Sequence, residues 1–450
     1  MSDEVDAVVE RVRERVTPDA GERAELQAVA ARLRERAEDA IAELPVEARV
    51  VQVGSTARGT WTAGDRDVDL FVSFPADLER ERLEKYGLDV GHAVLPEGHE
   101  EYAEHPYVKG VVEGYEVDLV PCYDVADATA IQSAVDRTPF HTRYLDKHLD
   151  DELAGDVRVC KQFMKAVGVY GSDLRTKGFS GYLTELLVLE HGGFRALVEA
   201  AADWTPPVRF DPEDHAAAGF DDPLVVIDPT DPERNVAAVL SAKQLATFQH
   251  YARKLLDEPR EALFESSEPD LIDAETVRER IADRETTPVA VVFDAPDLVD
   301  DQLWPQLVRS LDGVTEALDR RGFDVLRAEA FADERAVLFA ELEVAQRPAI
   351  ERHEGPPVHV RAHAERFYEK YADSAAAGPY IEGDRYVVER EREFTTATAL
   401  LQSDAVFDVA LGTHVESALE DGYEVLVGKE VGRLADEFGV ELGRYFDPKP

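Results

Sequence analysis

The chain has 450 residues, and its 94 acidic and 49 basic side chains give a formal net charge of −45. A hydrophobic content of 44% excludes a wholly disordered protein, because disorder requires low hydrophobicity together with high charge. The two cysteines, Cys122 and Cys160, are too few for a disulfide framework or a CxxC zinc site. No apolar run reaches the roughly 18 residues of a membrane span, and the acidic start Met1-Ser2-Asp3-Glu4 is unlike a signal peptide. We therefore expect a soluble, cytoplasmic protein that does not associate with membranes.

The acidic residues are spread along the whole chain rather than gathered in a tail. Such dispersed carboxylates repel one another and destabilise a compact state at ordinary ionic strength. In about 1 M salt the Debye length falls to about 3 Å, which screens this repulsion. We therefore interpret the charge as the adaptation of a halophilic protein and give it little weight as evidence about ligands.

The first 45 residues predict two amphipathic helices. Five valines follow helical spacing in the first helix: Val5, Val8, Val9, Val12 and Val16. Thr17-Pro18 predicts the break between the helices, with Thr17 as N-cap and Pro18 at the first position of the second helix.

Strand patterns follow these helices. Hydrophobic runs predict a strand over 48–53 that ends at Gly54-Ser55, and a second strand over 67–74. Residues 107–113 and 115–120 predict a hairpin that turns at Gly114. We expect these elements to form one α+β domain over residues 1–150.

The remainder of the chain predicts two further domains. Residues 151–270 are mostly helical in pattern, interrupted by a long irregular connection over 203–235 that is rich in Pro, Asp and Gly. From residue 287 a strand, a helix over 303–320 and a strand over 335–345 predict a β-α-β unit. We therefore expect a helical central domain over 151–270 and an α+β region over 271–450.

Three aspartates form the pattern with the clearest chemical meaning. Asp67 and Asp69 project from the same side of a predicted strand, because side chains alternate between faces. Asp118 lies on the second strand of the predicted hairpin. If the two strands are neighbours, the three carboxylates converge on a site suited to Mg²⁺, which prefers oxygen ligands. Such a site can stabilise the attacking and leaving oxygens of a phosphoryl transfer.

The Gly54-Ser55 corner adds a candidate phosphate site. Glycine allows close approach of the backbone to a ligand, and backbone N–H groups with the Ser55 hydroxyl could bind an anion. Arg58 can direct its planar donor fork to the same anion. A P-loop is excluded, because no G-x-x-x-x-G-K-[ST] motif occurs.

Each of these patterns alone is usually structural. A Gly-Ser pair is most often a turn, and a D-x-D pair in a chain with 94 acidic residues is most often a solvated strand face. The combination is more specific, because eleven residues separate the Gly-Ser corner from the D-x-D pair, which lies on the next predicted strand.

Gly54-Ser55 with Asp67-Val68-Asp69 resembles the signature of the polymerase-β-like nucleotidyltransferase superfamily. Further motifs are similar to those of the archaeal class I CCA-adding enzymes, the tRNA nucleotidyltransferases. They are Gly54-Ser-Thr-Ala-Arg-Gly-Thr-Trp61, Gly64-Asp-Arg-Asp-Val-Asp-Leu-Phe71, Val117-Asp-Leu-Val-Pro-Cys-Tyr123, Ser133-Ala-Val-Asp-Arg-Thr-Pro-Phe-His141, Gly178-Phe-Ser-Gly-Tyr-Leu183 and Asp228-Pro-Thr-Asp-Pro-Glu-Arg-Asn-Val236. The resemblance covers nearly the whole chain.

The resemblance implies a role for each matching position. Asp67, Asp69 and Asp118 match the catalytic, metal-binding carboxylates, although the first is often Glu in this family. The nucleotide-binding positions are matched by Ser55, Arg58, His141, Lys161, Tyr170 and Arg234, the last being the residue that helps to select the incoming base. The resemblance also implies a nucleotidyltransferase head with a mixed sheet, Mg²⁺ as cofactor, and tRNA, ATP and CTP as partners, and it allows a homodimer.

The residues themselves are compatible with these roles. Residues 137–177 contain eight Lys or Arg against six Asp or Glu, a basic island in an acidic chain. Such an island suits a triphosphate, although a basic helix face is by default only solvated. A lone histidine such as His141 is more often structural, and Tyr170 is either a core aromatic or a ring that stacks on a base.

We expect a template-independent enzyme that adds or repairs the terminal CCA of tRNA. The 3′-hydroxyl would attack the α-phosphate of CTP or ATP, and pyrophosphate would leave. One alternative is another nucleotidyltransferase of the same superfamily, of the poly(A), oligoadenylate or antibiotic-modifying type. Another is a catalytically silent RNA-binding protein, which the presence of all three aspartates disfavours.

The charge of −45 predicts that KCl stabilises the folded protein. The melting temperature should rise steeply from low to molar KCl, because screening removes the repulsion among dispersed carboxylates. Differential scanning calorimetry over a KCl series measures this, and a melting temperature that stays flat or falls contradicts the interpretation.

Overall fold

The computed structural model describes residues 2–102, 104–215, 219–266 and 270–450. The chain divides into two compact units, Met1–Ser267 with Pro450 and Glu268–Lys449. The first unit carries all the residues predicted to act in catalysis or nucleotide binding. The predicted division into three domains stays a prediction.

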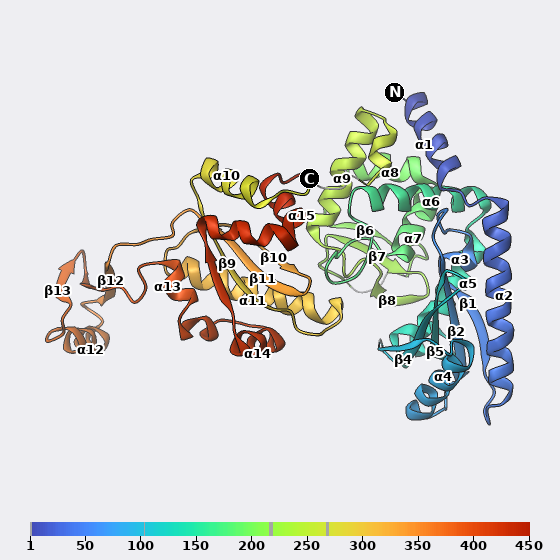
Figure 1. Ribbon diagram of the computed structural model, residues 1–450, viewed down its shortest axis with the longest axis horizontal. Coiled ribbons are helices and arrows are strands. Elements are labelled where there is room, and N and C mark those ends of the chain that lie inside the picture. Colours follow the sequence, from blue (N-terminus) through green and yellow to red (C-terminus); the bar gives the residue numbers. More distant parts are fainter. Residues whose placement is uncertain (1, 103, 216–218, 267–269) are drawn as a thin grey trace. The chain divides into compact units, whose positions relative to one another are not determined.

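The first unit combines one five-stranded sheet, one small sheet and a group of helices (Figure 1). Its helices are α1 (Ser2–Val16), α2 (Ala20–Ala42), α3 (Gly54–Arg58), α4 (Arg80–Val94), α5 (Thr138–His148), α6 (Asp151–Ala166), α7 (Gly181–His191), α8 (Phe194–Ala202) and α9 (Ala242–Asp257). Its strands are β1 (Arg49–Val53), β2 (Asp67–Pro75), β3 (His99–Tyr102), β4 (Pro106–Val112), β5 (Tyr115–Asp124), β6 (Val208–Phe210), β7 (Leu224–Asp228) and β8 (Asp231–Asn235).

The five-stranded sheet has the order β1-β2-β5-β4-β3 and is mixed, as expected for a nucleotidyltransferase head. Strands β2 and β5 are parallel neighbours, whereas β1 with β2 and β4 with β5 pair antiparallel. Val68, Leu70 and Val72 of β2 are buried in a core that includes side chains of α2 and α4. Alternation therefore directs Asp67 and Asp69 to the opposite face, as the sequence predicts.

The sequence predicted the first two helices correctly but not the cap between them. The N-cap of α2 is Asp19, which accepts a hydrogen bond from the backbone N–H of Glu22 and completes a capping box with it. Thr17 is not the cap, because its hydroxyl donates to the carbonyl of Arg13, at the end of α1. The capping box at Asp19 satisfies two N–H groups at once, which favours it as the start of the helix.

Helix α1 packs in the helical core rather than against the five-stranded sheet. Its valine stripe joins Val157 and Phe163 of α6 in one buried cluster that also includes Phe248 of α9. Aromatic rings fill this core, with the Phe163 ring centred 6.1 Å from that of Phe248. Residues at the start of the chain therefore support the helix that carries Lys161.

The predicted irregular connection over 203–235 is wrong in part. It contains a small sheet of order β6-β7-β8, in which β6 runs parallel and β8 antiparallel to β7. All five residues of β7, Leu224–Asp228, are buried. Burial on both faces removes the alternation by which a strand is normally recognised, so Pro, Asp and Gly around it dominated the pattern.

The second unit has an α+β fold, as predicted, with two sheets of order β10-β11-β9-β15 and β12-β14-β13. Its helices are α10 (Ala274–Arg284), α11 (Asp300–Arg320), α12 (Arg361–Tyr371), α13 (Ala397–Leu401), α14 (Thr413–Asp421) and α15 (Ala435–Phe446). Its strands are β9 (Thr287–Asp294), β10 (Val325–Ala332), β11 (Arg335–Leu342), β12 (Ile350–Pro357), β13 (Ala377–Glu382), β14 (Arg385–Glu391) and β15 (Glu424–Val427).

The β-α-β unit predicted here has an additional strand. The strand that follows α11 is β10, and β11 lies between β10 and β9, antiparallel to both. The predicted strand over 335–345 therefore closes a hairpin with β10. Alternate residues of β9 face two cores, one with Leu307 of α11 and one with Leu442 of α15, so helices cover both faces of the four-stranded sheet.

Both cysteines are free thiols and buried, as predicted for small apolar residues. Within the described parts of the chain, no helix is long and apolar enough to cross a membrane.

Candidate active site

The predicted catalytic aspartates lie at one end of the parallel pair β2 and β5. Asp69 is the direct register partner of Asp118, and Asp67 lies two residues before Asp69 on the same face. Residues in direct register on neighbouring strands have their side chains about 5 Å apart. The structure therefore brings Asp69 and Asp118 together from stretches that are far apart in the sequence.

The Gly54-Ser55 corner lies against Asp69. Strand β1 ends at Val53, the register partner of Asp69, and α3 begins at the next residue. Gly54 has φ of +77°, and a Cβ atom there would lie 2.0 Å from Oδ2 of Asp69. Only glycine meets both constraints, so its place in the motif follows from the position of this carboxylate. The half-buried Ser55 follows it at the start of α3.

The electrostatics of the three carboxylates disfavour their charged forms. Burial, followed by the charges of Asp118 and Asp67, raises the pKa of Asp69 to about 6. Burial is also the main reason why the pKa values of Asp67 and Asp118 are raised. A cation between the carboxylates would reverse these shifts, because an opposite charge favours the ionised form.

Lys109 partly supplies that positive charge. It lies on β4 opposite Asp118, with Nζ 3.5 Å from Oδ1 of Asp118 and 3.4 Å from Glu116. Oδ1 of Asp118 is nevertheless buried and accepts no hydrogen bond from the described residues. An oxygen without a hydrogen bond, beside two other carboxylates, fits the oxygen-ligand chemistry of Mg²⁺, although Lys109 also lies close to it.

Among the described residues, no group of three or more His, Cys, Asp or Glu side chains is arranged to hold a metal ion. The assignment of Asp67, Asp69 and Asp118 as metal ligands therefore stays a prediction, supported by the register of β2 with β5 and by the raised pKa values of the three carboxyl groups.

A second cluster holds Arg58 and Lys161 on the carboxylate of Glu185. Arg58 donates through Nη2 and Nε to the two oxygens of Glu185 at 2.7 and 3.3 Å, and Lys161 Nζ lies 3.6 Å from Oε1. Thr60 also donates its hydroxyl to Glu185, and Lys161 donates to the Thr60 carbonyl at 3.1 Å. The Arg58 fork thus binds a carboxylate within the protein, whereas the sequence predicted it to face an external anion.

The Glu185 carboxylate is fully buried, with 0% exposure. Burial alone would raise its pKa, but Lys161, Arg58 and the Thr60 hydrogen bond hold that pKa below its ordinary value. Burial lowers the pKa of Lys161, and Glu185 opposes this change. Glu185 is therefore the shared counter-charge of two cations on helices that come from different parts of the chain.

A third cluster gathers around Asp228, at the end of β7. Its Oδ2 lies 2.8 Å from Nε2 of His141 and accepts a hydrogen bond from Arg234 at 2.8 Å. Tyr182 and Thr230 donate to the other oxygen. The His141 ring stacks on that of Tyr182, with centroids 3.8 Å apart. His141 and Arg234 are thus held on one carboxylate.

The clusters adjoin one another through α5. Thr142 accepts a hydrogen bond from Arg58 at 3.2 Å, and its neighbour His141 contacts Asp228. The charge of Arg58 partly opposes the rise in the pKa of Asp69. Tyr170 is largely buried near Gly181, and burial raises the pKa of its hydroxyl. The structure therefore brings Arg58, His141, Lys161 and Arg234 into one connected network near the aspartates.

Three family models match successive parts of the chain. The model described as "Nucleotidyltransferase domain" matches residues 34–141, "tRNA nucleotidyltransferase, second domain" matches 155–265, and "CCA-adding enzyme, C-terminal domain" matches 284–428. A protein of Haloarcula marismortui named CCA-adding enzyme is 66% identical over 100% of both chains. This chain belongs to the CCA-adding enzymes.

Other relatives of the same name agree with this assignment. The CCA-adding enzyme of Halobacterium salinarum is 63% identical over 98% of this chain and 99% of its own length. That of Methanoregula boonei is 47% identical over 88% and 86%, respectively. The resemblance to archaeal CCA-adding enzymes is confirmed, and the other nucleotidyltransferases considered from the sequence are not favoured.

Sequence reasoning missed the anionic residues that hold the predicted binding residues. Glu185 lies between Leu183 and Leu186 on a predicted apolar helix, where a lone acid inside an apolar run could have indicated a buried ion pair. Asp228 begins one of the family motifs, but the motif by itself gave it no role. The partners of both residues are distant in sequence, so only the folded chain reveals them.

Replacing Asp69 by Asn should stabilise the metal-free protein at neutral pH. Its folded pKa of about 6 exceeds the ordinary value of 3.8, so the charged form costs stability. This cost is absent below about pH 4, grows as pH rises through about 6, and reaches about 3 kcal/mol above that. Urea unfolding at about pH 8 in molar KCl with a metal chelator measures the gain.

Asp77→Asn is the matched control, because Asp77 is exposed just beyond the end of β2. If Asp69→Asn and Asp77→Asn have the same unfolding free energy at that pH, then Asp69 is not under electrostatic strain.

Replacing Glu185 by Gln should destabilise the fold by about 3–5 kcal/mol, because two buried cations lose their counter-charge. Glu190→Gln on the same helix is the matched control, since Glu190 is exposed. Urea denaturation of both variants in molar KCl measures the difference. Equal urea midpoints for the two variants would show that Glu185 does not stabilise the buried charges of Arg58 and Lys161.

Proposed function

We propose that this protein adds or repairs the 3′-terminal CCA of tRNA, using CTP and ATP and releasing pyrophosphate. The observation that carries the proposal is its 66% identity, over full length, to a relative named CCA-adding enzyme. The Asp69–Asp118 pair beside the Gly54-Ser55 corner gives that activity a chemical basis.

Asp67, Asp69 and Asp118 are the residues that would hold Mg²⁺. Bound there, Mg²⁺ would neutralise charge on the attacking and leaving oxygens of an in-line displacement. The parallel register of β2 and β5 fixes the relative positions of Asp69 and Asp118. We assign removal of the 3′-hydroxyl proton to one of the three carboxylates, since the pKa of each is raised.

Arg58 and Lys161 would stabilise the triphosphate, with Ser55 beside them. Both cations are paired with Glu185, so neither is left buried without a counter-charge. One carboxylate offsets only one of the two positive charges, so this cluster keeps a net positive charge that would attract the anionic triphosphate. This arrangement requires little reorganisation of the fold.

His141, Tyr170 and Arg234 would contact the sugar and base. Oδ2 of Asp228 lies against Nε2 of His141 and accepts a hydrogen bond from Nη1 of Arg234. These two contacts limit the positions that the His141 and Arg234 side chains can take. A donor fixed in this way can discriminate between bases, because the wrong base leaves it without a partner. We assign Arg234 to selection between C and A.

The tRNA would be bound by its acceptor arm and 3′ end, and duplex RNA is recognised mainly by shape. At molar salt, phosphate contacts alone give little affinity, so stacking and hydrogen bonds must contribute more. A tRNA substrate implies action in the cytoplasm. A homodimer stays a prediction, which light scattering in molar KCl can test.

The purified protein should incorporate CMP twice and AMP once into tRNA that lacks CCA, in molar KCl with Mg²⁺. Asp69→Asn should lower the rate by more than about a hundredfold. Loss of a residue that only contacts a metal ligand costs up to about a hundredfold, and loss of the ligand itself should cost more. Asp77→Asn is the control, and labelled CTP and ATP supplied separately give the readout.

Absence of incorporation by the wild-type protein would refute the activity. Full incorporation by Asp69→Asn would refute the mechanism and leave the activity in place. Products longer than three nucleotides would favour a poly(A)-type enzyme.

A further inference from the structure

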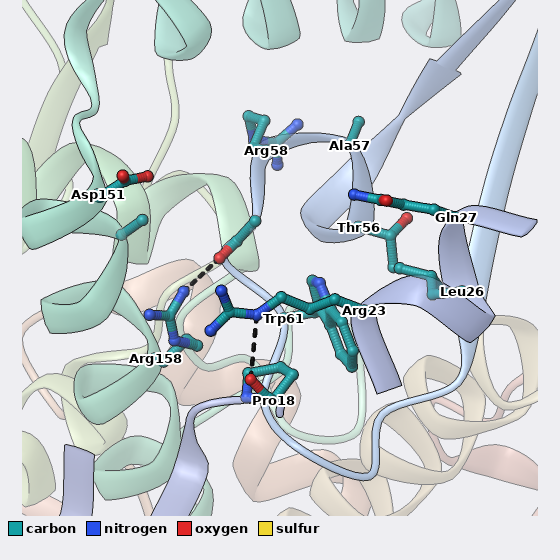
Figure 2. Close-up of a pocket in the computed structure, with 12 residues that line it drawn as sticks. Pro18, Arg23, Leu26, Gln27, Thr56, Ala57, Arg58, Trp61, Asp151 and Arg158 are labelled. Atoms are coloured by element: carbon teal, nitrogen blue, oxygen red, sulfur yellow. Dashed lines mark hydrogen bonds between the residues drawn. The ribbon is translucent and has the colours of Figure 1, made fainter. Parts of the chain in front are cut away.

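A polar pocket lies beside α3, between α2 and α6 (Figure 2). It has a volume of about 370 Å³. The residues that matter here are Arg23 and Gln27 from α2, Thr56 and Gly59 at and after α3, and Arg158 from α6. Gly54 faces Asp69, whereas Thr56–Gly59, which include Arg58, form a wall of this pocket.

Two arginines face this pocket without a carboxylate partner. Arg158 donates Nη1 to the carbonyl of Gly59, and its Nε is buried without a hydrogen bond. Arg23 donates Nε to the carbonyl of Pro18 at 3.0 Å. Figure 2 shows the two side chains extending toward each other. Neither arginine forms an ion pair with any described residue, although the chain has 94 acidic side chains.

A third arginine increases the local positive charge. Arg13 of α1 approaches Arg158 over Gly155, where a Cβ atom would lie 2.9 Å from Arg13 Nη1 and 3.6 Å from Arg158 Nη2. Arg13 is paired with Asp156 at 2.6 Å, so that carboxylate is already engaged. Burial, and then the charges of Arg23 and Arg13, lower the pKa of Arg158. Asp151 is the only acidic residue among the described residues that line the pocket.

A purely structural role for Arg23 and Arg158 uses few of their N–H donors. A guanidinium has five N–H groups, and Arg23 and Arg158 each donate one hydrogen bond to a carbonyl. The planar fork of arginine matches the geometry of phosphate oxygens and binds them in pairs. The amide of Gln27 and the hydroxyl of Thr56 add neutral donors to the same lining.

We propose that this pocket binds a phosphate group, as a second anion site separate from the catalytic aspartates. The phosphate would lie between the Arg23 and Arg158 guanidinium groups and offset their repulsion. Its source is either the backbone of bound RNA or free inorganic phosphate, which present the same oxygens. A ligand here contacts the end of α3 opposite to Gly54 and so stabilises the segment that carries the catalytic corner.

The test uses the full-length protein in molar KCl without divalent metal, titrated calorimetrically with inorganic phosphate. We expect one phosphate per chain for the wild type and a Kd at least tenfold higher for Arg23→Gln and for Arg158→Gln. Arg34→Gln is the matched control, because Arg34 is exposed on the same helix α2 and paired with Glu38; it should bind as the wild type does.

A measurement on the wild type alone covers the case in which a variant fails to fold. Phosphate should slow modification of Arg23 and Arg158 by phenylglyoxal severalfold, and that of Arg34 much less, as read by peptide mass spectrometry. A short single-stranded RNA that displaces phosphate identifies backbone phosphate as the ligand, and RNA that binds without displacing it identifies free phosphate. Absence of phosphate binding, or equal binding by wild type and both pocket variants, overturns the proposal.

Discussion

The rest of the site depends on two like charges held side by side. Asp69 and Asp118 are register partners on parallel strands, and partial burial raises the pKa of both. Such a pair lowers the stability of a protein unless a cation intervenes, and Lys109 does so only from one side. The strain is built into the sheet, because a core of Val68, Leu70 and Leu119 fixes the register on the opposite face. The placement of carboxylates that catalysis requires therefore lowers the stability of the folded sheet.

Elsewhere in the site, charged side chains inside the protein are stabilised by internal counter-ions. Glu185 pairs with Arg58 and Lys161, and Asp228 holds His141 and Arg234, so that the binding residues have partners within the protein. The pKa values of both carboxyl groups are lowered although burial opposes this, because their partners favour the ionised form. The pocket beyond α3 differs, since Arg23 and Arg158 have no such partner among the described residues. This contrast in a strongly acidic chain is the reason for expecting an external anion there.

Local patterns in the sequence were sufficient for much of the fold. Strands β1 and β2, the hairpin of β4 and β5, and the first two helices have alternating or helical spacing that residues near in sequence impose. The sequence pattern did not predict the strands in which burial is uniform or weak. Strand β7 is buried on both faces, and β10 is largely half-buried or exposed, so neither shows clear alternation. The cap of α2 was misplaced by two residues, because Asp19 and Glu22 complete a capping box that Thr17 cannot form.

The amino-acid sequence alone was enough to identify the family, the three aspartates and the Gly54-Ser55 corner, because these residues form motifs whose spacing can be read without knowledge of the fold. Only the folded chain established that Asp118 lies beside Asp69, that Arg58 binds Glu185, and that α1 supports the helix of Lys161. Ion pairs and strand register depend on distances between residues far apart in the chain, and a one-dimensional pattern carries no information about those distances.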